Sequence, residues 1–127
     1  MNRQNISSGA KWEDIVGYSR AVKVGNIVEV TGTVSLKEGK PFGVDDPFAQ
    51  TVRAIEIIEE TLSKAGSKLS DVIRTRIYVT DISQWEEIGK AHSQFFAEIK
   101  PATSMVEVSA LISPEFLVEI EASAIIS

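Results

Sequence analysis

The fold is decided by the stretch Val72-Ile73-Arg74-Thr75-Arg76-Ile77-Tyr78-Val79-Thr80, in which two kinds of side chain alternate. Alternation with a period of two predicts a β-strand whose two faces differ. The face expected to lie in the core comprises Ile73, Thr75, Ile77 and Val79. The opposite face is polar and comprises Arg74, Arg76 and Tyr78. The segment therefore predicts a sheet that buries one side and presents charge on the other.

Further strands are expected before and after this segment. Residues 18–34 predict a hairpin, because two β-branched runs flank Gly25-Asn26, a pair that tolerates positive φ. Residues 103–111 and 116–125 predict two more strands joined by a turn. The last strand is expected to bury Phe116, Val118, Ile120, Ala122 and Ala124, and to direct Leu117, Glu119, Glu121 and Ser123 to the opposite side. Residues 35–46 are rich in breakers and predict an exposed loop that edges a cleft.

Two amphipathic helices separate the strands. The first is expected over residues 47–65, because Asp46 can cap it, Pro47 suits the first helical position and Gly66 suits the stop. The second is expected to begin at Ser83, where Ser83-Gln84-Trp85-Glu86 matches a capping box, and to end before Pro101. Its apolar stripe is expected to comprise Trp85, Ile88, Ala91 or His92, Phe95 and Phe96.

The order β-β-α-β-α-β-β predicts an α+β sandwich with both helices on one face of a mixed sheet. The chain has 127 residues, so we expect one domain over residues 1–127. The helix-free face is expected to carry Arg74, Arg76, Tyr78, Glu107, Glu119 and Glu121. Two interpretations of this face stay open: a polar surface in water, or an interface between copies in which arginine and glutamate pair.

Composition excludes several classes of function. Cysteine is absent, which excludes disulfides, thiol nucleophiles and cysteine-based metal sites. The formal net charge of −5 disfavours a nucleic-acid partner. We find no secretory signal and no apolar run long enough to cross a membrane, so we expect a soluble cytoplasmic protein. The single histidine, His92, is expected to pack beside Ile88 and Phe95 rather than to serve as a catalytic base, and no metal site is expected.

Glu119 and Glu121 are two residues apart and face the same side of one strand. Their repulsion would raise the pKa of one carboxyl, which suits general acid–base chemistry in a sheltered cleft. For Glu119, catalysis and a structural ion pair stay equally open, whereas for Glu121 we favour an ion pair with Arg74 or Arg76. Tyr18 could bind or stack on a planar ligand, although simple packing explains it as well.

Several segments in their order along the chain resemble the RidA/YjgF family. They are Trp12-Glu13, Val16-Gly17-Tyr18-Ser19-Arg20-Ala21-Val22, Thr31-Gly32-Thr33, the stretch from Asp71 to Asp81, Phe95-Phe96, Pro101-Ala102, Met105-Val106-Glu107-Val108 and Val118-Glu119-Ile120-Glu121-Ala122. The resemblance covers nearly the whole chain. It implies a chorismate-mutase-like protomer and a homotrimer with small-molecule clefts between subunits.

The resemblance also implies an activity, the hydrolysis of enamine and imine intermediates to a keto acid and ammonia without metal or cofactor. Glu119 matches the glutamate that orients the attacking water in this family. Other residues fall where the family lines its pocket, namely Tyr18, Gly32, Thr33, Phe95, Phe96, Thr103 and Met105. In the family an arginine that binds the substrate carboxylate follows Pro-Ala, but here Thr103 follows Pro101-Ala102.

This departure predicts altered specificity. A charge-assisted contact stabilises by about 1.5–3 kcal/mol, so we expect weak activity on small 2-imino acids unless Arg20 or Arg76 replaces the missing group. The alternative is a trimer that binds or senses a metabolite without catalysis. An endoribonuclease or translation inhibitor, functions also ascribed to the family, is disfavoured by the acidic charge and by the lack of an RNA-binding aromatic motif.

Overall fold

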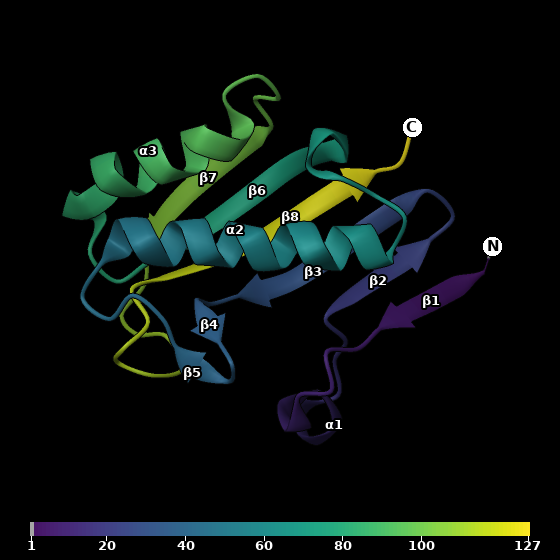
Figure 1. Ribbon diagram of the computed structural model, residues 1–127, viewed down its shortest axis with the longest axis horizontal. Helices are drawn as coiled ribbons and strands as arrows, with labels where there is room; N and C mark the ends of the chain where they lie inside the picture. The colour runs from purple at the N-terminus through teal and green to yellow at the C-terminus, as the bar shows by residue number, and fades with distance from the viewer. Residues whose placement is uncertain (1) are drawn as a thin grey trace.

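The computed structural model describes residues 2–127 and contains one large mixed sheet that carries two long helices (Figure 1). The strand order is β1-β2-β3-β8-β6-β7, and all neighbouring strands are antiparallel except β6 and β7, which are parallel. The strands of this sheet are β1 (Arg3–Ile6), β2 (Ala21–Val24), β3 (Ile27–Thr33), β6 (Val72–Val79), β7 (Ala102–Glu107) and β8 (Val118–Ile125). The expected mixed sheet is therefore confirmed.

Three α-helices and several short elements complete the chain. The helices are α1 (Lys11–Val16), α2 (Pro47–Lys64) and α3 (Trp85–Phe96). The short elements are strands β4 (Leu36–Lys37) and β5 (Lys40–Pro41) and the 3₁₀ turns η1 (Leu69–Asp71) and η2 (Ile82–Gln84). Helix α2 begins as predicted: Pro47 is its first residue, and the Asp46 carboxylate accepts a hydrogen bond from the Ala49 N–H at 3.0 Å.

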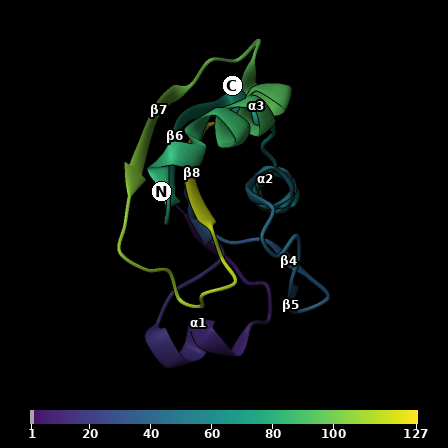
Figure 2. The same ribbon diagram turned by 90° about the vertical axis from the view of Figure 1, so that its left-hand side faces the viewer.

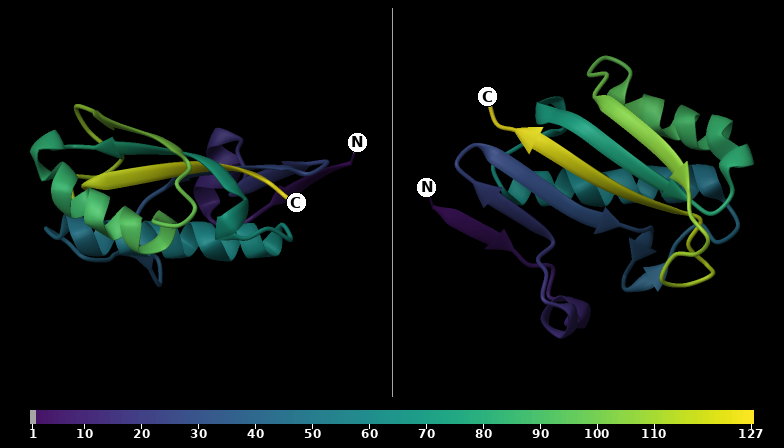
Figure 3. Two further views of the ribbon diagram at one scale, coloured as in Figure 1. Left: turned by 90° about the horizontal axis from the view of Figure 1, so that it is seen from above. Right: turned by 180° about the vertical axis from the view of Figure 1, so that it is seen from behind.

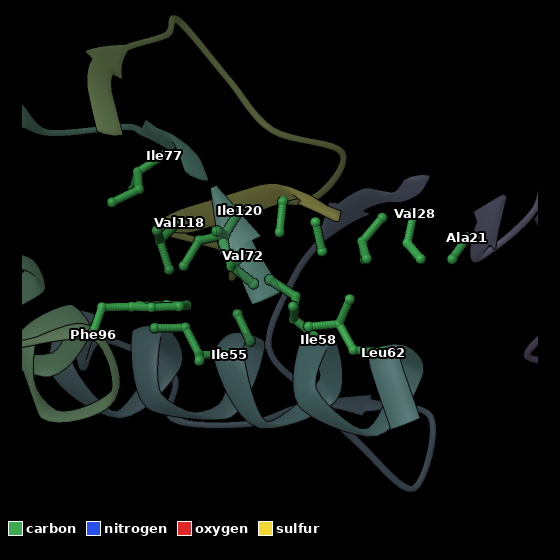
Figure 4. Close-up of a cluster of buried hydrophobic side chains, with 14 of the residues drawn as sticks. Ala21, Val28, Ile55, Ile58, Leu62, Val72, Ile77, Phe96, Val118 and Ile120 are labelled. Carbon is green, nitrogen blue, oxygen red and sulfur yellow. The ribbon is translucent and has the colours of Figure 1, made fainter. Parts of the chain in front are cut away.

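Both long helices lie on the same face of the sheet, and neither covers the opposite face, which only the short helix α1 borders at its edge (Figures 2 and 3). This opposite face is called the helix-free face below. Figure 4 shows the core between α2 and the sheet, where Ile55, Ile58 and Leu62 point toward Val118 and Ile120. All five of these side chains are 1% exposed or less. Burial of such a side chain stabilises by about 1.5–3 kcal/mol, so this layer contributes strongly to the stability of the protomer. The predicted α+β arrangement is confirmed.

The prediction that Ile73 points into the core is wrong, because β6 contains a bulge. Val72 pairs with Ala124 and Arg74 pairs with Ser123, so Ile73 has no partner of its own. The extra residue reverses the alternation, so that Val72 is 3% exposed and Ile73 is 51% exposed. From Arg74 onward the two faces are as predicted.

The N-terminal elements β1 and α1 were not expected from the sequence. Strand β1 lies at the edge of the sheet and pairs with β2, with Ile6 opposite Ala21. Three of its four residues are exposed, so its sequence shows no alternation. Helix α1 ends at Gly17, whose φ of 91° and N–H bond to the Glu13 carbonyl form a left-handed cap.

Three other boundaries need correction. Residues 35–46 contain the small hairpin β4–β5 rather than only a loop. The expected capping box at Ser83 is not found: Asp81 caps the 3₁₀ turn η2 by accepting from the Ser83 N–H at 3.0 Å, and α3 begins at Trp85 after Gln84, which makes no side-chain cap bond. Trp85 is 56% exposed and therefore does not belong to the buried stripe. Strand β7 ends at Glu107 instead of residue 111. In residues 2–127, no helix is both long and apolar enough to cross a membrane.

Candidate functional site

The helix-free face gathers polar side chains on neighbouring strands. Arg76 on β6 lies opposite Glu121 on β8, and Tyr78 lies opposite Glu119. The Tyr78 hydroxyl donates to Glu121 Oε1 at 2.8 Å, and this bond, together with burial, raises the pKa of Tyr78. The face is thus a set of specific polar contacts, with the two adjacent carboxylates at its centre.

The expected ion pair between Glu121 and an arginine does not form within one protomer. Arg74 instead donates from Nη2 to Ser104 Oγ on β7 at 2.7 Å. Among residues 2–127, the one ion pair lies elsewhere, between Arg53 and Glu56 at 3.4 Å on α2. Glu121 is therefore bonded to the Tyr78 hydroxyl instead of to the arginine that was expected beside it.

Gly32 lies directly beneath the carboxylate of Glu119. Strand β3 has a bulge here, because Val30 pairs with Ala122 and Thr33 with Ile120, which leaves two residues of β3 opposite one of β8. A Cβ atom at Gly32 would overlap Oε2 of Glu119. The carboxylate therefore occupies space that only glycine leaves free. A glycine within a β-branched strand is a sequence signal for such a bulge or close approach.

Glu119 is half-buried, and its environment favours the protonated form. Burial raises the pKa of its carboxyl, the nearby charge of Glu121 raises it further, and the charge of Arg20 lowers it. A carboxylate whose pKa is raised is a stronger base than an ordinary surface carboxylate, so it accepts a proton from water more readily. This electrostatic setting is the expected one for a general base.

Arg20, considered above as a displaced substrate clamp, holds the bulge in β3. Its Nη2 donates to the carbonyls of Thr31 and Gly32, both at 2.9 Å, and to Thr33 Oγ1 at 2.7 Å. Thr33 itself is fully buried. Arg20 therefore connects the backbone under Glu119 to the start of β2. This contact cannot be read from the sequence pattern, because it depends on the bulge.

A cavity of about 700 Å³ lies next to β3, between α1 and the helix-free face. Its lining includes Tyr18 and Asp14 near α1, and Arg76 and Glu121 from the sheet. Of the predicted site residues, Tyr18 lines this cavity, whereas Glu119 and Gly32 lie outside its lining. Arg76 is exposed where it lines this cavity.

The remaining predicted site residues lie on the helix-covered side of the sheet. Thr103 on the edge strand β7 is exposed and pairs with the buried Thr75. Met105 and Phe95 pack against the core, and Phe96 belongs to it with 2% exposure. The sheet therefore separates this second group from Glu119 within one protomer, and the buried Phe96 does not line an open cleft there.

His92 makes a polar contact that the sequence analysis missed. Its ring packs against Phe96, with 4.6 Å between ring centroids, and burial lowers the pKa of the imidazole. Its Nε2 atom lies 3.0 Å from Thr75 Oγ1, which in turn lies 2.8 Å from Thr103 Oγ1. The packing role predicted for His92 holds for the ring, but its nitrogen connects to a candidate site residue.

Comparison with known proteins places this arrangement in context. The family model described as Endoribonuclease L-PSP matches residues 9–126. A RutC family protein from Pyrococcus abyssi is 38% identical over 108 residues, which cover 84% of each chain. A 3-aminoacrylate deaminase, RutC, from Acinetobacter baylyi is 36% identical over 108 residues, which cover 84% of this chain and 85% of the relative.

A solved structure agrees with the sequence matches. It is a crystal structure of a member of the YjgF/YER057c/UK114 family from Mycobacterium tuberculosis, 53% identical, with a TM-score of 0.90. The match covers 98% of this chain and 100% of the other. The resemblance predicted from the sequence motifs, and the fold that it implies, are confirmed.

Proposed function

Because the chain belongs to the Endoribonuclease L-PSP family, which includes the YjgF and RutC proteins, we propose that it is an enamine and imine deaminase-type hydrolase. The observation that carries the proposal is the position of Glu119, a half-buried carboxyl with a raised pKa held over Gly32. The relative named as a 3-aminoacrylate deaminase supports the same class of reaction.

The reaction needs a water molecule and a base. An enamine first tautomerises to its imine, and a water oxygen then bonds to the carbon of the C=N group while Glu119 accepts a proton from that water. That proton is returned to the nitrogen, which gives a carbinolamine with one hydroxyl and one amino group. The hydroxyl hydrogen then passes through Glu119 to the nitrogen as the C=O bond forms and the C–N bond breaks, so ammonia and a keto acid leave. The net change is addition of one water and loss of one ammonia, so no oxidant or reductant is consumed.

We further propose that the working unit is a homotrimer with its sites between subunits. In one protomer the sheet separates Glu119 from Thr103, so a small ligand cannot touch both. Apolar side chains on the helix-free face are exposed, including Ile27 at 47% and Ile125 at 41%, as is usual for a surface that a partner covers. Contact between this face and edge strand β7 of a second copy would bring the two groups together.

Specificity follows from Thr103, which offers a neutral hydroxyl where the family uses an arginine. A neutral hydrogen bond stabilises a bound carboxylate less than a charge-assisted pair does. Thr103→Arg should therefore raise kcat/KM for 2-imino acids by about 10- to 100-fold, whereas an uncharged imine should gain little. An equal gain on both substrates would contradict this assignment.

The direct test measures keto acid and ammonia released from an imine that an amino-acid oxidase generates in the same solution. Wild-type protein should accelerate the release, and Glu119→Gln should abolish the acceleration while leaving the fold intact. Glu59→Gln on the exposed side of α2 is the matched loss of one carboxylate and should retain full activity. Acceleration that survives Glu119→Gln would refute the mechanism.

The missing arginine at position 103 also favours a second candidate, a trimer that binds a metabolite without turnover. Under that alternative, wild-type protein would bind a keto acid such as pyruvate but would not accelerate imine hydrolysis, and Glu119→Ala would change only the affinity. The acidic net charge of −5 continues to disfavour RNA as a substrate, so incubated RNA should remain intact.

Subunit complementation tests the shared site. Glu119→Gln and Thr103→Asp should each be inactive alone, the second because a like charge lies beside an anionic substrate. In randomly mixed trimers about a quarter of the interfaces would combine one intact Glu119 with one intact Thr103, so activity should reappear on mixing. No recovery, with mixed trimers verified by native mass spectrometry, would place both residues in the same subunit's site.

A further inference from the structure

Three hydrogen-bonded contacts connect His92 to the surface of the edge strand. His92 Nε2 lies 3.0 Å from Thr75 Oγ1, and Thr75 Oγ1 lies 2.8 Å from Thr103 Oγ1. Thr103 Oγ1 in turn lies 3.1 Å from the carbonyl oxygen of Pro101. The chain begins at a half-buried ring on α3, passes through a fully buried threonine on β6 and ends at an exposed threonine on β7.

The number of available hydrogens determines which atom donates in each of these three bonds. Three contacts need three hydrogens, but the two threonine hydroxyls supply only one each and the Pro101 carbonyl supplies none. The third hydrogen must come from Nε2 of His92. His92 then donates to Thr75, Thr75 donates to Thr103, and Thr103 donates to Pro101. If Nε2 lacked a hydrogen, two oxygen atoms would face each other without a hydrogen between them.

The last bond is the easiest to exchange. A distance of 3.1 Å is long for an O–H···O bond, whose usual length is about 2.7–2.8 Å. Thr103 is also the exposed member of the chain, so an incoming oxygen acceptor can replace the Pro101 carbonyl. The Thr103 lone pair that faces Thr75 is already occupied, which leaves its hydrogen as the group to offer a ligand.

We propose that His92 and Thr75 are positioning residues that make the Thr103 hydroxyl a hydrogen-bond donor, selecting ligands with an oxygen acceptor such as a carboxylate. The proposal rests on the proposed function, because it assigns Thr103 to the substrate cleft. It deepens that function by naming the group that replaces the arginine. This group is the Thr103 hydroxyl, whose hydrogen is directed outward by the bonds to Thr75 and His92.

The environment of His92 agrees with this assignment. Packing against Phe96 fixes the plane of the ring, and burial lowers the pKa of the imidazole, so the neutral form is favoured at neutral pH. A neutral imidazole carries one hydrogen, and the hydrogen count places it on Nε2. The Nδ1 atom is then the unprotonated nitrogen.

Nitrogen-15 NMR tests the direction of the hydrogen bonds between His92, Thr75 and Thr103 without any assay of turnover. The protein has one histidine, so the imidazole signals of the ¹⁵N-labelled full-length protein need no further assignment. We expect a neutral ring with the hydrogen on Nε2 at pH 7.5. If the hydrogen were on Nδ1 alone, Thr75 would donate to His92 and Thr103 would donate to Thr75. The Thr103 hydrogen would then not be free for a ligand, which would overturn the proposal.

A double-mutant cycle tests the effect on ligands. Thr75→Val keeps the shape of the buried side chain but removes the hydroxyl that links His92 to Thr103. We expect it to raise the KM for a 2-imino acid about 5-fold, with a smaller change in kcat. In a Thr103→Val background the same substitution should have no further effect on KM. Equal effects in both backgrounds would show a general structural role and refute the proposal.

Conservative variants separate this role from damage to the core. Thr75→Ser keeps the hydroxyl and should keep the wild-type KM. His92→Phe should behave like Thr75→Val, whereas His92→Gln, which retains an N–H donor, should restore much of the affinity. If His92→Gln and His92→Phe raise KM equally while both remain folded by circular dichroism, His92 acts by packing alone and the proposal fails.

The two proposals fail separately. Pyruvate, the keto acid product of 2-iminopropanoate, is used as a binding probe in place of turnover. If no imine is hydrolysed but pyruvate binding shows the same coupling between Thr75 and Thr103, catalysis fails and the positioning role stands. If Glu119-dependent turnover is present but the coupling is absent, only the positioning role fails.

Discussion

The two faces of the same sheet contrast most clearly in β8, where neighbouring residues point to opposite sides. Ile120 is fully buried beneath the helices, whereas Glu119 is half-buried on the helix-free face. The buried residues of the strand support stability, whereas the residues between them, apart from Ile125, carry polar groups. A β-strand can therefore hold a polar side chain in place on one face while its other face maintains the fold.

The largest expected effect contrasts two isoleucines of β8. Ile120→Ala should lower the free energy of unfolding by about 2–5 kcal/mol, because it leaves a cavity in the core. Ile125→Ala, on the helix-free face, should change it by less than about 1 kcal/mol in the dissociated protomer. Urea denaturation over a range of protein concentrations measures both, and a comparable loss for Ile125→Ala at the lowest concentration would contradict the division.

Gly32→Ala tests the position of the carboxylate on the helix-free face. The added methyl group would displace Glu119, so we expect kcat/KM for imine hydrolysis to fall about 100-fold, equivalent to about 2.7 kcal/mol. Gly89→Ala, in the interior of α3 with nothing near the added methyl group, should instead raise the free energy of unfolding by up to about 1 kcal/mol. Unchanged kcat/KM in Gly32→Ala would show that the position of Glu119 is unimportant.

A pH profile tests the electrostatics of that face. Glu119 acts as a base only when ionised, so activity should rise with pH through its raised pKa. This rise in activity is the acid limb of the pH profile. Arg20→Gln removes a nearby positive charge and should move the acid limb to higher pH, whereas Arg20→Lys should leave it nearly in place. Glu121→Gln removes a negative charge and should move the limb to lower pH. Shifts in the same direction would contradict the assignment of the limb to Glu119.

The smallest expected effect concerns stability. Because folding raises the pKa of Glu119, the folded state loses stability as pH rises from the ordinary glutamate pKa, about 4.3, through the raised value. Glu119→Gln should therefore give a slightly higher Tm than wild type at pH 7, and the difference should vanish below about pH 4. A lower Tm at pH 7 would mean that ionised Glu119 stabilises the fold.

The sequence predicts the parts of the molecule whose pattern is local. The alternation in β8 and the Asp46-Pro47 start of α2 both appear as expected. The family motifs predict Glu119 as the candidate base. Strand β1 is missed because a short edge strand acquires its structure from pairing with β2. The bulge at Ile73 is missed because register depends on the partner strand.

The candidate site is less predictable than the fold, because its contacts join distant segments. Arg20 reaches Gly32 only after the bulge in β3 has formed, and His92 reaches Thr103 only through Thr75 on another strand. The family motifs predict that Thr103 and Glu119 share one pocket, but they give no information on the side of the sheet on which each residue lies. That separation became visible only in the folded protomer.

The position of these two residues on opposite sides of one sheet has a consequence for how activity depends on abundance. If neither half-site works alone, a dilute protomer is inert, and specific activity should fall steeply below the dissociation constant of the assembly. Newly made chains would then acquire their catalytic capacity at the moment of association. The cellular concentration of the protein would act as a threshold, with no separate regulator needed.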